Sequence, residues 1–346
     1  MYNFLFLLVG LNLQISWIIE EGEISMSEES IADLGEFGFV ELLKSRLAPA
    51  SQVILGLGDD AAIVQLENNR VVASTDMLVE GQHFKRDWSS ARDIGHRAAA
   101  ANLADIVATG ATPTALLIGL AIPHSTKVDW LIELVDGICE EAALVNAAVV
   151  GGDTTKSDNL IISITALGNI NETGLSQAPL KRSGAEPGNL VILAGRLGWA
   201  EAGLNALRKG FKSPKLVCDA HRRPKVPYFA GSIAKDFVSS MIDVSDGLLQ
   251  DLGHIAKASK VHIDIKTVAL IPEQEILDVA AALNVDPMIW AMTGGDDHAF
   301  VATLPRSRQV PDGFKVIGEV FEGEAQVTVD GKHFLGQKGH DHFKFS

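Results

Sequence analysis

The chain has 346 residues, of which 47% are hydrophobic and 21% are charged. This length and composition fit two ordinary domains and exclude disorder as the main state. The 44 acidic and 29 basic residues give a formal charge of -15, which argues against a broad nucleic-acid-binding surface. Cys139 and Cys218 lack ligand-like spacing, so we expect no disulfide scaffold, no zinc site and a reducing cytoplasm.

The N-terminal stretch is apolar but fits no targeting signal. Residues 1–19 carry no Lys or Arg ahead of the apolar run, and Asn12 and Gln14 interrupt it. A secretory signal needs a basic start, and a membrane span needs roughly 20 apolar residues. We therefore interpret residues 1–33 as an extension outside the fold, with the start at Met26, and a membrane-associating segment is the alternative. No membrane partner is expected for the rest of the chain.

Residues 34–170 are predicted to form one α/β domain, because short β-branched runs alternate with alanine-rich helical segments. Helices are expected at residues 91–108, ending before Gly110, and at residues 128–146. A passage rich in Gly, Ser, Pro and Thr follows at residues 169–188. Strands are expected at residues 53–55, 61–66, 70–74, 114–121, 148–150 and 160–167.

Residues 180–346 are expected to form a second domain. Helices are predicted at residues 200–209, 228–238 and 248–257, with two short helices later and a Pro-rich stretch at residues 213–227. Strands are expected at residues 190–194, 241–243, 262–265, 299–304, 315–320 and 325–329. This mixture favours α+β layers of sheet against helices over a doubly wound parallel sheet.

Aspartates recur at the ends of predicted strands, beside glycine or small polar residues. Five clusters contain them: Gly58-Asp59-Asp60, Ser74-Thr75-Asp76, Gly151-Gly152-Asp153-Thr154, Asp243-Val244-Ser245-Asp246-Gly247 and Gly294-Gly295-Asp296-Asp297. A single Gly-Asp pair is most often a turn. Five clusters that converge would repel one another and raise carboxylate pKa values unless cations intervene. Their oxygen ligands suit magnesium, which typically brings phosphates with it.

Asp105 lies near the C-terminal end of a predicted helix, where the helix dipole disfavours negative charge. Metal ligation would compensate the charge, and a solvated surface carboxylate is the alternative. His83 follows Asp76 closely enough to hold a substrate near metals, although a lone histidine is more often structural. Arg182 is the best outlying cation for a phosphate, and a solvated loop arginine is an equal alternative.

Conventional nucleotide-binding and nucleophile signatures are absent from the sequence. There is no G-x-x-x-x-G-K-[ST] phosphate loop, no protein-kinase motif set and no G-x-S-x-G elbow. The turn at residues 195–198, ahead of a predicted helix, could bind an anion or simply connect strand to helix. No lysine or arginine lies inside the aspartate motifs, so metal ions must do most of the charge neutralisation.

Seven motifs together resemble the thiamine-monophosphate kinase family, in order and with family-like spacing from about Leu34 to the C-terminus. The motifs lie at residues 56–61, 74–84, 102–106, 151–155, 182–185, 243–248 and 339–343. The resemblance implies the two-domain fold of aminoimidazole ribonucleotide synthetase, with residues 34–170 binding ATP and magnesium and forming a homodimer through their sheet. It also implies ATP-dependent phosphorylation of thiamine monophosphate to thiamine diphosphate, the last step of thiamine diphosphate biosynthesis, in the cytoplasm.

The resemblance also implies residue roles. The implied metal ligands are Asp60, Ser74, Thr75, Asp76, Asp105, Asp153, Asp243 and Asp246. The implied ATP contacts are Gly152, Asp153, Arg182 and Ser245, and the implied contacts to thiamine monophosphate are His83, Asp296 and His340. Catalysis would rest on Asp76, Asp105 and Asp153.

Two departures from the family pattern concern substrate contacts. The family often has Gly-Gly-Glu-Asp-Tyr-Glu where this chain has residues 294–299, so Asp296 offers a carboxylate one methylene shorter. His340 stands where a Trp or Tyr is usual, which weakens stacking on the thiamine rings. The metal-ligand motifs all match.

The implied mechanism is direct in-line transfer of the γ-phosphoryl group, which needs no strong base because the acceptor phosphate is already an anion. A rival interpretation is an ATP-dependent synthetase of the same fold. Its selenophosphate type would need a reactive cysteine that neither Cys139 nor Cys218 supplies. A magnesium-dependent nucleotide sensor without turnover and a plain phosphohydrolase are two further rival functions.

Overall fold

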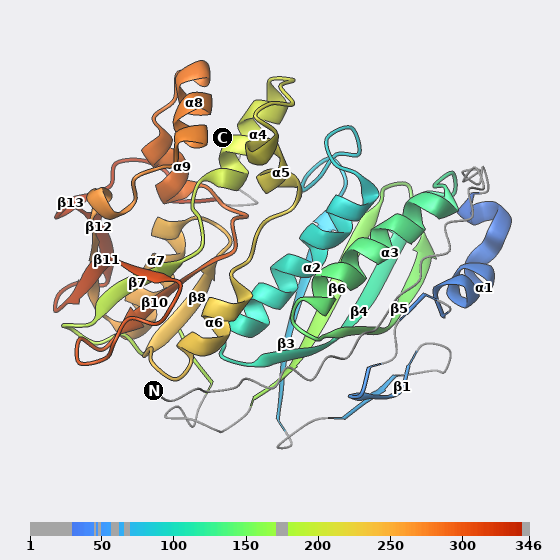
Figure 1. The fold of residues 1–346 in the computed structure, drawn as a ribbon, viewed down its shortest axis with the longest axis horizontal. Coiled ribbons are helices and arrows are strands. Elements are labelled where there is room, and N and C mark those ends of the chain that lie inside the picture. Colours follow the sequence, from blue (N-terminus) through green and yellow to red (C-terminus); the bar gives the residue numbers. More distant parts are fainter. Residues whose placement is uncertain are drawn as a thin grey trace, which may run out of the picture.

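The computed structural model describes residues 30–44, 46–47, 50–56, 62–65, 70–170 and 179–340. Most of the expected extension, residues 1–29, lies outside these described residues, as does the predicted ligand Asp60. The described chain forms two halves that lie side by side, each with one main sheet (Figure 1). The expected mixed α/β class, with sheets covered by helices, is confirmed.

The first half contains a four-stranded sheet with the order β3-β6-β4-β5. Its strands are β3 (Val71–Val79), β4 (Thr112–Ile122), β5 (Ala148–Lys156) and β6 (Ile161–Asn169). A short pair, β1 (Val53–Leu55) and β2 (Ile63–Val64), accompanies it, and the helices are α1 (Ile31–Lys44), α2 (Ala91–Ala108) and α3 (Val128–Ala143). β6 pairs antiparallel with both β3 and β4, whereas β4 and β5 run parallel.

Helices α2 and α3 cover one face of this sheet. Alternate residues of β4 and β6, such as Ile118 and Ile164, are buried against them because successive strand residues point to opposite faces. The two helices touch through glycines. A Cβ atom at Gly95 would lie 2.1 Å from the carbonyl oxygen of Leu134, and one at Gly137 would lie 2.1 Å from that of Arg92. Their backbones are therefore in direct contact.

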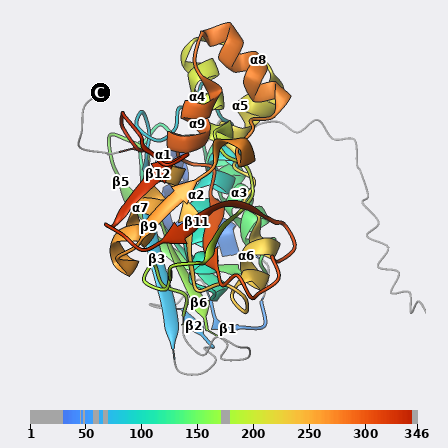
Figure 2. The ribbon, with the colours of Figure 1, turned by 90° about the vertical axis from the view of Figure 1, so that its left-hand side faces the viewer.

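The second half contains a seven-stranded sheet with the order β13-β12-β9-β11-β7-β10-β8. Its strands are β7 (Leu190–Ala194), β8 (Ser240–Val244), β9 (His262–Ile265), β10 (Ala299–Leu304), β11 (Phe314–Phe321), β12 (Gln326–Val329) and β13 (Lys332–His333). Its helices are α4 (Trp199–Arg208), α5 (Lys215–Arg222), α6 (Tyr228–Ala234), α7 (Leu248–Ser259), α8 (Gln274–Leu283) and α9 (Pro287–Thr293), with a 3-10 turn at Thr267–Ala269. Helices α4, α5, α8 and α9 stand together at one end of the molecule (Figure 2).

Helix α2 is the element that joins the two halves. It packs on β3 and β6 in its own half and also contacts α5, α6 and β8 of the other half. One continuous core results, since Leu103 and Ile106 of α2 share a cluster with Phe300 of β10 and Tyr228 of α6. Residues carried by α2 therefore face both sheets.

Three expectations about elements are wrong. Strands β3 and β5 continue beyond residues 74 and 150, so Asp76 and Asp153 lie inside strands rather than at their ends. The polar Ser-Thr-Asp run resembles a turn, but β6 pairs with β3 along its whole length. The Pro-rich stretch contains α5, whose N-cap is Pro214.

No single helix in the described part of the chain is long and apolar enough to span a bilayer, although α8 and α9 together, bent by 114°, pass by length and composition.

Candidate active site

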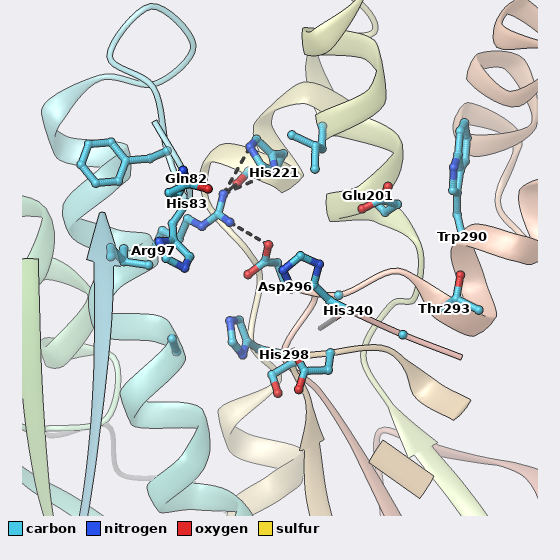
Figure 3. A pocket seen from close by; sticks show the side chains of 18 of the residues that line it. Gln82, His83, Arg97, Glu201, His221, Trp290, Thr293, Asp296, His298 and His340 are labelled. Carbon is cyan, nitrogen blue, oxygen red and sulfur yellow. Dashed lines mark hydrogen bonds and ion pairs between the residues drawn. The ribbon is translucent and has the colours of Figure 1, made fainter. Parts of the chain in front are cut away.

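A cavity of about 940 Å³ lies between the two halves. The first half contributes the end of β3, the loop at residues 81–88 and one face of α2 (Figure 3). The second half contributes β8 with the residues after it, one face each of α4 and α9, His221 of α5, the loop ahead of β10 and residues 334–340. Four of the seven family-like motifs, at residues 74–84, 102–106, 243–248 and 339–343, contribute lining residues.

Four predicted metal ligands line one region of this cavity: Asp76 of β3, Asp105 of α2, Asp243 of β8 and Asp246 just after β8. Side chains on neighbouring elements hold the first two in place. Ser74 Oγ donates a hydrogen bond to Asp105 Oδ2 at 2.5 Å, and the backbone N–H of Asp76 donates to Asn102 Oδ1 at 3.0 Å. Strand β3 and helix α2 are thus tied together where their carboxylates meet.

Two of these carboxylates, Asp76 and Asp105, have raised pKa values, chiefly because they are buried and in part because other carboxylates lie near them. Burial raises the pKa of Asp105 to about 7, and the charge of Asp243 adds to the shift, while the hydrogen bond from Ser74 opposes it. Burial also raises the pKa of Asp76, whose other nearby charges include Asp243 and Asp246. A carboxylate shifted in this way favours any cation that can take the place of the proton.

This electrostatic strain predicts a specific pH dependence of stability. Because the pKa of Asp105 rises from 3.8 unfolded to about 7 folded, the folded state loses stability as pH rises through that window. Asp251, with a pKa of about 8, acts in the same direction. Without magnesium, we expect the Tm to fall from about pH 5 to about pH 8. Differential scanning fluorimetry would measure this slope, and Asp105→Asn should flatten it.

His298 is a site residue that sequence reasoning missed as a functional group. It is buried, and its Nδ1 lies 3.1 Å from Asp243 Oδ2. Burial works against the charged imidazole, but the hydrogen bond and charge of Asp243 prevail, so the pKa of His298 is raised. In the sequence, only its position directly after Asp296 and Asp297 could have indicated a functional role for His298. Its partner Asp243 lies 55 residues away and leaves no local pattern.

Asp297 shows which of the two expected roles the turn at residues 195–198 has, anion binding or a connection between strand and helix. The backbone N–H groups of Gly198 and Ala200 donate to its two carboxylate oxygens, the second at 2.8 Å. The N-terminus of α4 is therefore occupied by a buried side chain of the same protein, so the turn connects strand to helix and does not bind an external anion. Burial raises the pKa of Asp297 to about 7 despite these two bonds.

The three residues implied to contact substrate also line the cavity. His83 accepts a hydrogen bond at Nδ1 from the Val79 backbone N–H at 3.0 Å. His340 is exposed, and its backbone N–H donates to the carbonyl of Asp246 at 2.8 Å. Asp296 forms an ion pair with Arg97 at 2.7 Å. Burial opposes ionisation of Asp296, but the charges of Arg97 and nearby histidines lower its pKa overall.

The remaining predicted residues take other positions. Ser245 lines the cavity. Thr75 lies on the sheet face away from α2, where its Oγ1 donates to the Ile164 carbonyl at 3.0 Å. Gly152 and Asp153 are exposed on β5, at the sheet edge opposite β3, with β6 and β4 between them and Asp76. Arg182 is exposed in the passage before β7, and its carbonyl accepts from Ser259 Oγ at 2.9 Å.

The carboxylates that line the cavity suit magnesium by chemistry. Carboxylate oxygens are the ligands this ion prefers, and burial raises the pKa values of Asp76 and Asp105, which favours a neutralising cation beside them. As they are placed, the described His, Cys, Asp and Glu residues include no group of three or more that could hold an ion. The chemistry of the donors therefore suits the metal, whereas the present spacing of the described residues does not form a site.

Two family models match the chain: AIR synthase related protein, N-terminal domain, at residues 58–170, and its C-terminal domain at residues 186–330. The fold and the cavity between two halves thus define an AIR synthase related protein. Thiamine-monophosphate kinase of Mycobacterium tuberculosis strain H37Rv is 40% identical over 94% of this chain and 96% of its own. The enzyme of Escherichia coli strain K12 is 32% identical over 89% and 98%. This chain belongs to the thiamine-monophosphate kinase family.

Solved structures agree with this assignment. Thiamine-monophosphate kinase from Stenotrophomonas maltophilia K279a superposes with a TM-score of 0.75 at 28% identity, covering 86% of this chain and 97% of that one. AaThiL complexed with AMPPCP and TMP gives 0.72 at 27% identity, covering 90% and 97%. Hydrogenase maturation protein HypE in complex with ATP, at 19% identity and a TM-score of 0.63 over 79% and 84%, shares the fold.

Proposed function

We propose that this chain transfers the γ-phosphoryl group of ATP to thiamine monophosphate, giving ADP and thiamine diphosphate, the last step of thiamine diphosphate biosynthesis. The observation that carries the proposal is the meeting of four family-motif carboxylates, two from each half, in one cavity. Two relatives support it through their names, and a structural neighbour supports it through its bound ATP analogue and TMP.

Asp76, Asp105, Asp243 and Asp246 are the residues we propose to hold magnesium. The motif match also assigns Asp60, Thr75 and Asp153 to the metal, but within one copy of the chain Thr75 faces the other side of the sheet and Asp153 lies at its far edge. Ser74 acts through its hydrogen bond to Asp105. When bound, magnesium neutralises and aligns the phosphates of donor and acceptor. The protein's own part is to hold carboxylates from two sheets at fixed positions, so that little reorganisation is needed during transfer. In-line transfer to an acceptor that is already anionic needs no general base.

Substrate contacts are proposed from the same cavity. Ser245 would contact ATP in this cavity, whereas Gly152, Asp153 and Arg182, which the motif match also assigns to ATP, do not line it. Three residues that line the cavity would contact thiamine monophosphate: His83, Asp296 and His340. The side chain of Asp296 is 47% exposed and therefore accessible to a ligand. The cavity volume of about 940 Å³ lies within the range of about 300–1,000 Å³ that is typical of small-molecule sites.

We propose a homodimer formed through the sheet of the first half. The face of this sheet away from α2 and α3 carries Val71 and Met77 with exposed fractions of 49% and 55%. Thr75 and Thr165 lie on the same face and are hydrogen bonded to each other at 3.1 Å. A second copy would cover this surface, and light scattering should then give twice the chain mass of 36.9 kDa.

We propose that residues 34–170 form the first domain and residues 180–346 the second, and that residues 1–33 are an extension outside the fold. The cytoplasm is the compartment we propose, because Cys139 and Cys218 are both free thiols. No nucleic-acid or membrane partner is proposed.

The proposed reaction is tested by incubating the purified chain with ATP, magnesium and thiamine monophosphate, with and without the acceptor. Chromatography would follow thiamine diphosphate and ADP. Diphosphate formed in step with ADP is the expected result. ADP without diphosphate would indicate a phosphohydrolase or another acceptor, and no ADP at all would indicate a nucleotide-binding protein without turnover.

A further inference from the structure

Helix α2 presents a row of residues along the whole cavity. Arg97, Ala101 and Asp105 all line it, and their spacing of four residues places them on one face of the helix. Eight residues at 1.5 Å each separate the Cα atoms of Arg97 and Asp105 by about 12 Å along the axis. The cavity therefore has an acidic end at Asp105 and a second end at Arg97.

Arg97 connects three segments at this second end. Its guanidinium is buried, and Nη2 donates to Asp296 Oδ2 at 2.7 Å in the loop before β10. Nη1 donates to the His221 carbonyl at 2.8 Å and lies 3.3 Å from Nε2 of the same imidazole, in α5 (Figure 3). A planar guanidinium with several fixed donors suits this task better than an ammonium group.

The side chains that Arg97 holds are chemically suited to the ring portion of thiamine monophosphate. That portion carries a cationic thiazolium and an aminopyrimidine, which donates hydrogen bonds. Asp296 offers it a carboxylate that is half-exposed to the cavity. Burial and the charge of Arg97 lower the pKa of His221 to about 3, so its imidazole is neutral at pH 7 and does not repel a cation. Trp88, edge-to-face with His221 at 6.2 Å, adds an aromatic wall.

We propose that Arg97 is a positioning residue that fixes Asp296 and His221 as the contact surface for the ring portion of thiamine monophosphate, about 12 Å along α2 from the phosphate end at Asp105. The proposal rests on the proposed function and deepens it. Arg97 itself does not bind a phosphate, because both of its terminal nitrogens are already engaged with Asp296 and His221.

Steady-state kinetics of Arg97→Gln test the proposal. We expect the KM for thiamine monophosphate to rise about tenfold or more, because one misplaced polar contact is worth about 1.4 kcal/mol or more, while the KM for ATP stays within about twofold. Arg97→Lys keeps the charge but cannot hold both partners, so its KM should lie between. Arg92→Gln is the matched control: Arg92 is an ion-paired arginine of the same helix that faces Asp136 of α3, and its loss should change neither constant.

A double-mutant cycle with Asp296→Asn separates positioning from a general structural role. Because Arg97 holds His221 as well as Asp296, the double variant should have a KM for thiamine monophosphate above that of Asp296→Asn but clearly below the product of the two single effects. Multiplicative effects, or an equal rise in the KM for ATP, would overturn the proposal. A rise confined to ATP would instead make Arg97 a phosphate-binding residue and would also overturn it.

Direct measurement of thiamine monophosphate binding distinguishes failure of the proposed reaction from failure of the proposed role of Arg97. If the wild-type chain forms no thiamine diphosphate, the proposed function fails, and calorimetry with thiamine monophosphate then tests Arg97 alone. Binding that weakens about tenfold in Arg97→Gln and is retained in Arg92→Gln supports the positioning role, and equal binding in all three proteins overturns it. Should Arg97→Gln not fold, by thermal unfolding, Arg97→Lys and Asp296→Asn carry the same comparison.

Discussion

Replacing Asp105 with asparagine is expected to lower the rate of thiamine diphosphate formation by about a thousandfold while the chain remains folded. Asp105 lies where carboxylates from both halves meet, and Ser74 fixes its orientation. Asparagine keeps the size and one oxygen of the side chain but removes the charge that a magnesium ion would neutralise. The same change removes repulsion with Asp243, so the magnesium-free protein should become more stable near pH 8, where the wild-type carboxylate is ionised.

Coupled measurements of turnover and Tm on the same samples would check this pair of effects. Asp312→Asn is the control, because Asp312 is an exposed aspartate outside the cavity and its replacement should alter neither quantity. Near-normal turnover in Asp105→Asn would remove Asp105 from the metal set. Loss of turnover together with a lower Tm would indicate a structural role instead.

Replacing Gly137 with alanine is expected to destabilise the protein by about 3 kcal/mol, because the new methyl group cannot fit. Its Cβ would lie 2.1 Å from the carbonyl oxygen of Arg92, which is backbone and cannot move aside alone. Helices α2 and α3 would have to separate, and the buried Ile94, Leu134 and Ile138 would lose packing. Urea unfolding would give the free energy difference.

Gly253→Ala is the matched control for this prediction. Gly253 is also a glycine inside a helix, α7, but a Cβ atom there meets nothing within 4 Å. Alanine should therefore stabilise the protein by up to about 1 kcal/mol through its higher helix propensity. If both variants changed stability by the same amount and sign, the close helix contact would not be the cause of the Gly137 effect.

Elements with strong local signals were predictable from the sequence. Helix α2 begins and ends at the expected residues because Ser90 and Asp93 form a capping box and Gly110 takes a left-handed conformation with φ 77. Strands β7, β9 and β10 also have the expected limits. Where the predicted element limits were wrong, strand pairing or packing between elements outweighed the local sequence preference. β3 extends through polar residues because β6 lies beside it, and Pro214 starts α5 rather than preventing a helix.

Part of the acidic region was predictable, because the recurring aspartate clusters and the position of Asp105 near a helix C-terminus are visible in the sequence, whereas Thr75 and Asp153 do not line the cavity. The part around Arg97 was not. Arg97 contacts His221 and Asp296, which lie 124 and 199 residues away, and no local pattern marks such a partner. Asp297 shows the same limit, since its sequence neighbours suggest a metal ligand whereas its carboxylate caps α4 from across the fold.

Because the carboxylates are divided between two sheets, the geometry of the site depends on how the two halves are placed relative to each other. Residues 70–170 supply Asp76 and Asp105, and residues 179–340 supply Asp243 and Asp246. Each half alone carries two charges that cannot enclose a polyphosphate. Selection can therefore tune this enzyme through the surface along α2 where the halves meet, and two separately expressed fragments would regain activity only on association.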